Sequence, residues 1–181
     1  MRQHWFPKPY ADTVMRLRVP SGFLLAILFG LLSDPSLNSL VMGFVIGALG
    51  LLLRAWAAGH LAKNQNLAES GPFAWTRNPL YLGTLYVALG LAVAARSWIV
   101  FAVVVLVFVF VYIPVIEQEE QHLIKIFTGY AAYAERVPIL FPRVPKQFGA
   151  GKFQPALYWK NEEWKAGLAF LAGMGYLAWK M

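Results

Sequence analysis

The chain contains no cysteine and few charged side chains. Its 181 residues include no Cys, only 14% are Asp, Glu, Lys or Arg, and 59% are hydrophobic. The absence of cysteine excludes disulfide bonds, a cysteine nucleophile, thiolate metal ligands and lipoprotein acylation. The scarcity of charge lies outside the usual range of water-soluble domains, and the long uncharged stretches are typical of membrane helices.

Several functional patterns are missing as well. The three histidines form no HExxH motif and no pair four residues apart, and no carboxylate stands at ligand spacing near His60. We therefore expect no bound metal. No internal repeat is present, which disfavours a repeat-built transporter. The net charge of +7 resides in segments that flank apolar stretches, so it favours anionic membrane lipids as partners and not nucleic acid.

The apolar segments predict one all-α, polytopic membrane domain over residues 1–181, with about five transmembrane helices. The first segment lacks a small-x-small cleavage site, so we expect it to be retained as a span and not removed as a signal peptide. The last segment either spans or lies at the interface, and we favour a span. The five predicted spans are residues 19–33, 37–58, 79–95, 98–116 and 164–179.

The basic residues predict the orientation. All but two of the Lys and Arg residues fall within residues 1–18, 54–78 and 117–165. Alternating spans bring these three segments to one side of the membrane, which the positive-inside rule identifies as cytoplasmic. We therefore expect an inner or plasma membrane protein whose N-terminus and functional site face the cytoplasm.

One candidate site lies at the start of the third span. Asn78 and Pro79 suit the N-cap and the first position of a helix. Arg77 stands immediately outside the membrane and Tyr81 one turn inward, at a helix N-terminus that attracts anions such as a carboxylate or phosphate. Arg54, near the end of the second span, either extends to the interface or contacts a substrate.

A second candidate site lies after the fourth span. Its carboxylates Glu117, Glu119 and Glu120 either line an exposed helical turn or bind hydroxyl or ammonium groups, and we favour binding. Tyr130 and Tyr133 share a helix face, where they either stack on a base or a sulfonium group or belong to an interfacial aromatic belt. We expect a cytoplasmic pocket built from a loop and a short helix beyond this span.

The two segments together resemble the isoprenylcysteine carboxyl methyltransferase and phospholipid methyltransferase superfamily of integral membrane methyltransferases. The resemblance covers residues 43 to 142. Three positions depart from the pattern: Asn78 replaces the usual His, Val115 replaces an Arg of the carboxyl methyltransferases, and Gly129 directly precedes Tyr130. The matching motifs are Gly71-Pro72-Phe73, Arg77-Asn78-Pro79-Leu80-Tyr81-Leu82-Gly83, Glu119-Glu120-x-x-Leu123, Tyr130-x-x-Tyr133 and Val137-Pro138.

The resemblance implies an enzyme that transfers a methyl group from S-adenosylmethionine to a lipidic or isoprenoid acceptor entering from the bilayer. The implied catalytic residues are Arg77, Glu119 and Glu120. The implied cofactor-binding residues are Asn78, Tyr81, Glu119, Glu120, His122, Leu123, Tyr130 and Tyr133.

The acceptor and the reaction class remain open at this stage. A carboxylate acceptor needs only an aligned cation such as Arg77 or Arg54, whereas an amine must lose a proton, which Glu119, Glu120 or His122 could accept. A phospholipid amine N-methyltransferase is thus an alternative to an isoprenylcysteine-type enzyme. Two further hypotheses are a nicotinamide-dependent reductase of the sterol-reductase-like group and a non-enzymatic membrane scaffold.

Overall fold

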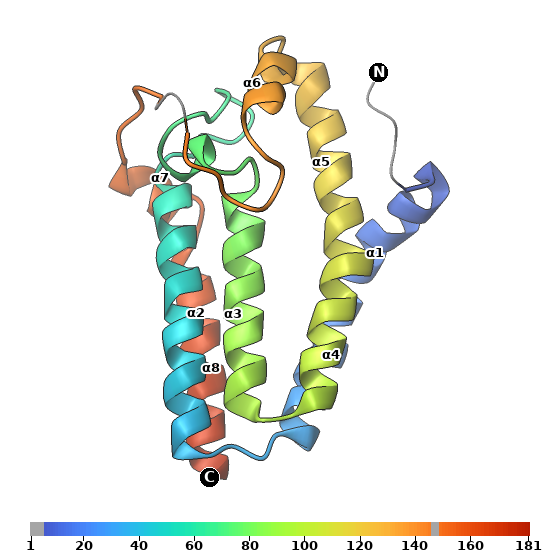
Figure 1. Ribbon diagram of the computed structural model, residues 1–181, viewed down its shortest axis with the longest axis vertical. Coiled ribbons are helices and arrows are strands. Elements are labelled where there is room, and N and C mark those ends of the chain that lie inside the picture. The colour runs from blue at the N-terminus through green and yellow to red at the C-terminus, as the bar shows by residue number, and fades with distance from the viewer. Residues whose placement is uncertain (1–5, 146–148) are drawn as a thin grey trace.

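The described part of the protein, residues 6–145 and 149–181 of a computed structural model, consists of helices and contains no strand. The long helices run along one axis, and the loops and short helices collect at one end of the molecule (Figure 1). The C-terminus lies at the opposite end. The all-α prediction is confirmed for the described residues.

The tightest packing in the protein joins α2 (Leu37–Ala58) to α3 (Pro79–Ala95), and both helices have their predicted bounds. A Cβ atom placed on Gly43 would lie 2.3 Å from the carbonyl oxygen of Gly90, and one on Gly50 would lie 2.6 Å from that of Gly83. The two backbones therefore touch, as small residues allow between membrane helices. Ser39 adds a bond across this contact, because its hydroxyl donates to the carbonyl of Ala94 at 3.0 Å.

The fourth helix is longer than predicted. It was expected to end at residue 116, but it continues through α4 (Trp98–Val107), the π-helical turn η2 (Phe108–Tyr112) and α5 (Ile113–Ile126) as one helix, Trp98–Ile126. The apolar composition typical of a membrane span ends at residue 116. The helix continues beyond it because Glu, Gln and Lys are good helix formers.

The π turn coincides with a proline inside this helix. Pro114 has no N–H, so the carbonyl of Phe110 four residues earlier loses its helical donor. The hydroxyl of Tyr10 donates to that carbonyl at 2.7 Å. The break in the hydrogen-bond ladder thereby becomes an attachment point for the N-terminal helix.

That N-terminal helix, α1 (Lys8–Leu32), also begins earlier than the predicted span at residue 19. It is bent by 48° between Pro9–Leu17 and Val19–Leu32, and Pro20 lies inside it, a residue that kinks helices by removing a donor and crowding the preceding turn. Val14, in the first part, is buried against the core around Val115. The segment before the bend thus covers α5.

The predicted number of about five spans is not confirmed. By length and composition, α2 and the Trp98–Ile126 helix can cross a membrane, and α1 makes a third if its bent halves form one span. α3 and α8 (Trp164–Lys180) have 17 residues each, or about 26 Å, slightly less than the roughly 30 Å of bilayer hydrocarbon. α8 packs along α2, with Phe170 filling the space beside Gly47.

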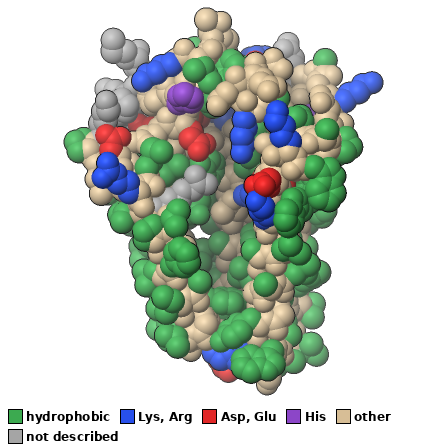
Figure 2. All heavy atoms as spheres, turned by 180° about the vertical axis from the view of Figure 1, so that it is seen from behind, with side chains coloured by type: hydrophobic (Ala, Val, Ile, Leu, Met, Phe, Trp, Pro, Cys, Tyr) green, Lys and Arg blue, Asp and Glu red, His purple; other side chains and the backbone are tan. Residues whose placement is uncertain are grey.

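Charged side chains gather at the loop-bearing end, and hydrophobic side chains cover the helices below it (Figure 2). Of the three predicted basic segments, the described parts of 54–78 and 117–165 reach this same end (Figure 1). The exposed ion pair of Arg96 and Asp34 lies where α3 ends and α2 is about to begin. Arg2 and Lys146, which belong to the predicted basic segments, lie outside the described residues. The side of the membrane remains a prediction.

The loop-bearing end is covered by the 310 turn η1 (Gly71–Ala74), α6 (Tyr130–Arg136), α7 (Pro155–Lys160) and their connections. His60 fixes part of this cover, because its Nδ1 lies 2.9 Å from the hydroxyl oxygen of Ser70. Gly71 has a φ of +58°, and a Cβ there would lie 2.7 Å from the imidazole ring. Burial lowers the pKa of His60 below its ordinary value of 6.5.

The glycine contact yields the first prediction. Gly90→Ala places a methyl group 2.5 Å from the backbone nitrogen of Gly47, so we expect a loss of about 1–3 kcal/mol of stability from overpacking. Thermal unfolding in detergent measures it. Gly175→Ala, in α8 with no atom within 4 Å, is the matched control and should unfold at or slightly above the wild-type temperature. Equal melting temperatures for the two variants would contradict the close α2–α3 contact.

His60 yields a pH-dependent prediction. Because burial lowers its pKa in the folded state, the unfolded chain takes up a proton first as the pH falls below 6.5. Stability should therefore be greatest above that value and decline below it. We expect the melting temperature to fall more steeply between about pH 7.5 and about pH 5 in the wild type than in His60→Gln. Parallel curves for the two proteins would show that His60 is not the group responsible.

Candidate functional site

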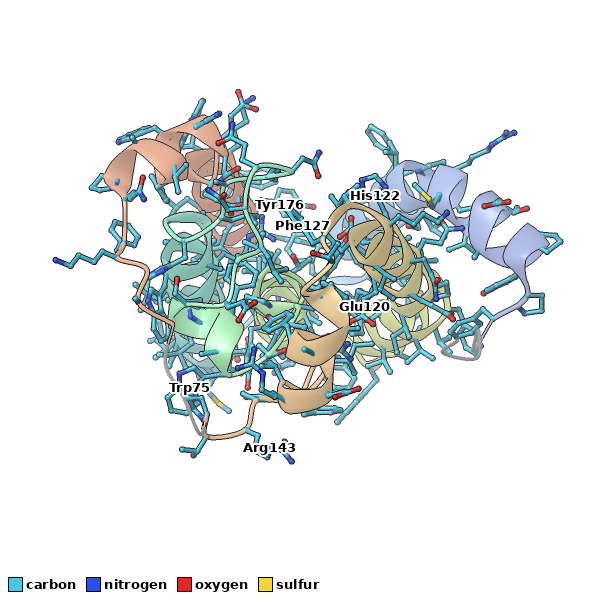
Figure 3. All side chains as sticks on the ribbon, turned by 90° about the horizontal axis from the view of Figure 1, so that it is seen from above. Trp75, Glu120, His122, Phe127, Arg143 and Tyr176 are labelled. Atoms are coloured by element: carbon cyan, nitrogen blue, oxygen red, sulfur yellow. The ribbon has the colours of Figure 1, made fainter. Side chains whose placement is uncertain are left out.

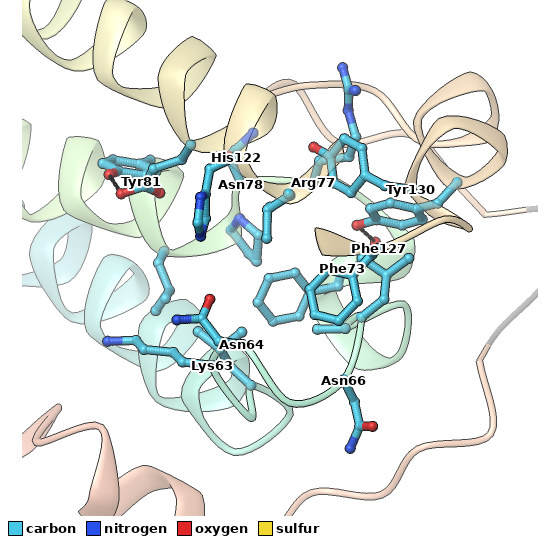
Figure 4. Close-up of a pocket in the computed structure, with 18 of the residues that line it drawn as sticks. Lys63, Asn64, Asn66, Phe73, Arg77, Asn78, Tyr81, His122, Phe127 and Tyr130 are labelled. Carbon is cyan, nitrogen blue, oxygen red and sulfur yellow. Dashed lines mark hydrogen bonds between the residues drawn. The ribbon is translucent and has the colours of Figure 1, made fainter. Parts of the chain in front are cut away.

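A cavity of about 460 Å³ lies under the cover at the loop-bearing end. Its wall is formed by the last turn of α2, the loop of residues 61–68, the first turns of α3, the end of α5 and α6. Phe73, Phe127 and Tyr130 lie on one side of it and Tyr81 and His122 on the other (Figure 4). The two segments that the sequence singled out therefore meet at one cavity.

Arg77 is the most unusual group on the cavity wall. Its backbone N–H donates to the carbonyl of Pro138 at 2.9 Å, which fixes the residue just before α3. Its side chain is 6% exposed, and Nη1 lies 3.2 Å from Oε1 of Glu120. Nevertheless, Nε and Nη1 have no hydrogen-bond partner among the described residues. Buried donors normally have hydrogen-bond partners, so Nε is an exception, while Nη1 is ion-paired with Glu120 without a hydrogen bond.

Asn78 acts differently from the predicted helix cap. It occupies the N-cap position of α3 and is followed by Pro79 at the first helical position, as expected, but its side chain makes no capping bond. Instead, Nδ2 donates to the carbonyl of Ile139 at 2.9 Å and lies 3.5 Å from Oε1 of Glu120. Asn78 therefore holds the chain after α6 against the start of α3.

The three glutamates point in different directions, because successive residues on a helix are rotated by about 100°. Glu119 is exposed on the cavity wall, and its Oε1 accepts a hydrogen bond from the hydroxyl of Tyr81 at 2.6 Å. Glu120 is buried beside Arg77 and does not line the cavity. Glu117 is buried too, and accepts from the backbone N–H of Phe6 at 3.2 Å. The alternative of an exposed, solvated turn is wrong for Glu117 and Glu120.

Tyr130 and Tyr133 form an aromatic wall and not an interfacial belt. They are 1% and 3% exposed, and both line the cavity. Their rings meet edge to face, with centroids 5.8 Å apart. The hydroxyl of Tyr133 donates to the carbonyl of Phe73 at 2.8 Å, and burial raises the pKa of this tyrosine far above its usual range. Tyr133 is therefore a neutral donor at any physiological pH.

The remaining predicted residues, His122 and Leu123, also line the cavity. His122 is exposed, whereas Leu123 packs against the cluster of Tyr130 and Tyr133. Viewed from the loop-bearing end, Phe127 lies near the middle of the molecule, while Trp75 and Arg143 lie at its edge (Figure 3).

Sequence reasoning missed part of the wall. The loop of residues 61–68, Phe127 and Glu163 face the cavity but belong to no motif, and a loop has no periodicity that identifies its inward residues. Arg54 also lines the cavity, and its guanidinium donates to the carboxylate of Glu163. Within the described residues, no group of three or more His, Asp or Glu side chains is arranged to hold a metal ion.

Known proteins resemble parts of this chain. It is 37% identical to the cobalt-zinc-cadmium resistance protein CzcN of Cupriavidus metallidurans over 58% of this chain and 50% of that protein. It is 31% identical to the nickel-cobalt-cadmium resistance protein NccN of Alcaligenes xylosoxydans xylosoxydans over 55% and 49% of the two chains. It is 26% identical to the protein-S-isoprenylcysteine O-methyltransferase of Schizosaccharomyces pombe over 76% and 61%.

The chain spans about half the length of the first two of these relatives. No solved structure matches it. The family model described as phospholipid methyltransferase matches residues 38–129, slightly more than half of the sequence, which include the cavity residues of α2, α3 and α5. The chain therefore belongs to the phospholipid methyltransferase family, whose membrane methyltransferases the two sequence motifs had indicated.

Proposed function

We propose that this chain binds S-adenosylmethionine in the cavity and transfers its methyl group to a lipidic acceptor that enters from the bilayer. The observation that carries the proposal is Arg77, a buried cation on the wall of a cavity of about 460 Å³, whose Nε and Nη1 make no hydrogen bond within the described residues. A cavity of this volume lies within the range of small-molecule sites. Membership of the family supplies the reaction class.

The chemical groups on the wall suit the parts of this cofactor. Arg77 would bind its carboxylate, since a guanidinium pairs with two carboxylate oxygens at once. Glu119, held by Tyr81, would accept from its ammonium group or ribose hydroxyls. The aromatic rings of Phe73, Phe127, Tyr130 and Tyr133 offer faces for the adenine and for the sulfonium cation.

The protein's own contribution to methyl transfer is positioning and the exclusion of water, because the displacement at the methyl carbon neutralises charge. Glu120 and Asn78 would serve as positioning residues, since Glu120 lies behind Arg77 and Asn78 holds the chain beside it. An amine acceptor would need a base, and Glu119 and His122 are the titratable groups of α5 on the cavity wall.

The acceptor is proposed as lipidic or isoprenoid, with a phospholipid amine as the alternative. Val115, which stands where the carboxyl methyltransferases have Arg, is buried in the core beside Val14 and Ile116 and does not line the cavity. The absence of an Arg at that position therefore carries no argument against a carboxylate acceptor here. Two relatives are named for metal resistance, and we propose that methyl transfer, not metal binding, underlies any such role of this chain.

Isothermal titration with S-adenosylmethionine in detergent tests the site. We expect Arg77→Gln to weaken binding on the order of 10- to 100-fold, the value of a charged hydrogen-bonding group. Arg96→Gln removes an equally basic side chain from the opposite end of α3 and should bind as the wild type does. Equal affinity of both variants would refute the role of Arg77. Stabilisation of the wild type by NADPH but not by S-adenosylmethionine would instead favour the reductase hypothesis.

Transfer of labelled methyl groups from S-adenosylmethionine to membrane lipids tests the role of the Glu119 carboxylate. Glu119→Gln removes the charge that faces the cavity but can still accept from Tyr81, so we expect lower transfer to membrane lipids with little loss of stability. Glu135→Gln, an exposed carboxylate on α6, is the control and should keep wild-type transfer. Undiminished transfer by Glu119→Gln would exclude this side chain from the site. Chromatography of the labelled lipid then identifies an ester or an amine product.

A further inference from the structure

Arg54 is a second guanidinium on the same cavity, and it makes four hydrogen bonds. Nε and Nη2 donate to the two carboxylate oxygens of Glu163 at 3.0 Å each. Nη1 donates to the carbonyl of Leu80 at 3.2 Å and to the hydroxyl of Thr84. Arg54 thus binds one carboxylate through two parallel bonds, the arrangement that guanidinium groups use for carboxylate ligands.

The carboxylate comes from a separate part of the chain. Glu163 stands at the N-cap of α8, outside residues 38–129, whereas Arg54 and Thr84 lie inside them. Its side chain is 9% exposed, yet the residue lines the cavity. The carboxylate at the start of α8 therefore pairs with Arg54, a cation that lies within residues 38–129 and lines the cavity.

α8 does not depend on this ion pair for its position. Phe170 and Leu177 are 1% and 0% exposed, and the hydroxyl of Tyr176 donates to the carbonyl of Gly30 at 2.8 Å. The turn before α8 has its own attachment, because Nδ2 of Asn161 donates to the carbonyls of Ala58 and Leu61 at 3.0 and 2.9 Å. Glu163 can therefore leave Arg54 by side-chain rotation while its helix stays in place.

Arg54 and Arg77 line the cavity beside different turns of α3. Arg77 precedes the helix, whereas Arg54 bonds to Leu80 and Thr84, one to two turns further along. The pair is only partly buried, with the Arg54 side chain 21% exposed, and the desolvation of its charges offsets much of their attraction, so its net contribution to stability is small. Replacing Glu163 by an external carboxylate would conserve every bond that Arg54 makes.

We propose that Arg54 recognises the carboxylate of the methyl acceptor, and that Glu163 occupies this position as an internal substitute until the acceptor displaces it. That the ligand is a methyl acceptor rests on the proposed function. That Arg54 binds a carboxylate can be tested by binding alone. It assigns a carboxylate-headed lipid to the end of the cavity that Arg54, Thr84 and Glu163 form. It also makes Glu163 a specificity residue that weakens binding of anions unable to replace a carboxylate.

Titration of the full chain in dodecyl maltoside with dodecanoate tests the inference. Glu163→Gln removes the competing charge, so we expect it to bind dodecanoate at least about tenfold more tightly than the wild type. The double variant Arg54→Gln/Glu163→Gln, which buries no unpaired charge, should lose this gain. Glu162→Gln is the matched control, because its exposed neighbouring carboxylate pairs with Lys165 and should not affect binding.

Three results would overturn the inference: equal affinity in Glu163→Gln and Glu162→Gln, a gain that survives in the double variant, or equal binding of neutral dodecanol. Tighter binding of dodecyl phosphate than of dodecanoate would also reject the carboxylate. S-adenosylmethionine binding is measured on the same samples. Its absence from the wild type would contradict only the proposed function, whereas its presence without a dodecanoate effect would contradict only the role of Arg54.

Discussion

The direct contact between the backbones of α2 and α3 is the constraint on which the rest of the structure depends. Gly43 and Gly50 on one helix face Gly90 and Gly83 on the other, with no room for a side chain between them. This contact sets the distance from Arg54 to Thr84 and brings the loop between the two helices over the start of α3. The connection over residues 59–78 is longer than two adjacent helix ends need, and its residues form part of the cavity wall.

The second constraint is electrostatic. A guanidinium as buried as that of Arg77 requires a nearby negative charge, which Glu120 supplies, and the pair has lost its hydration. Nε and Nη1 of Arg77 nevertheless make no hydrogen bond within the described part of the chain. A structure that served stability alone would satisfy these buried atoms, so their lack of hydrogen bonds in a residue that lines the cavity is the main support for the proposed ligand site.

Local sequence predicted much of the helical framework and the two halves of the candidate site. α2 and α3 have the bounds that their long apolar stretches predicted, with Pro79 at the start of α3. The extension of the fourth helix to residue 126 was missed, because a change from apolar to polar composition was interpreted as the end of the helix. That change marks the surface of the membrane, whereas helix ends depend on backbone hydrogen bonding and propensity.

The sequence by itself indicated that the chain is helical, that it has membrane-type segments, and that Arg77, Tyr81 and Glu119 belong to one candidate site, whose cavity all three line. Only the tertiary structure showed that Glu120 forms an ion pair with Arg77, and that Glu163 forms one with Arg54. The physical reason is that composition and motif spacing are local properties, whereas the direction of a side chain and its partner depend on contacts between distant segments. Residues 54 and 163 meet only because α8 packs along α2.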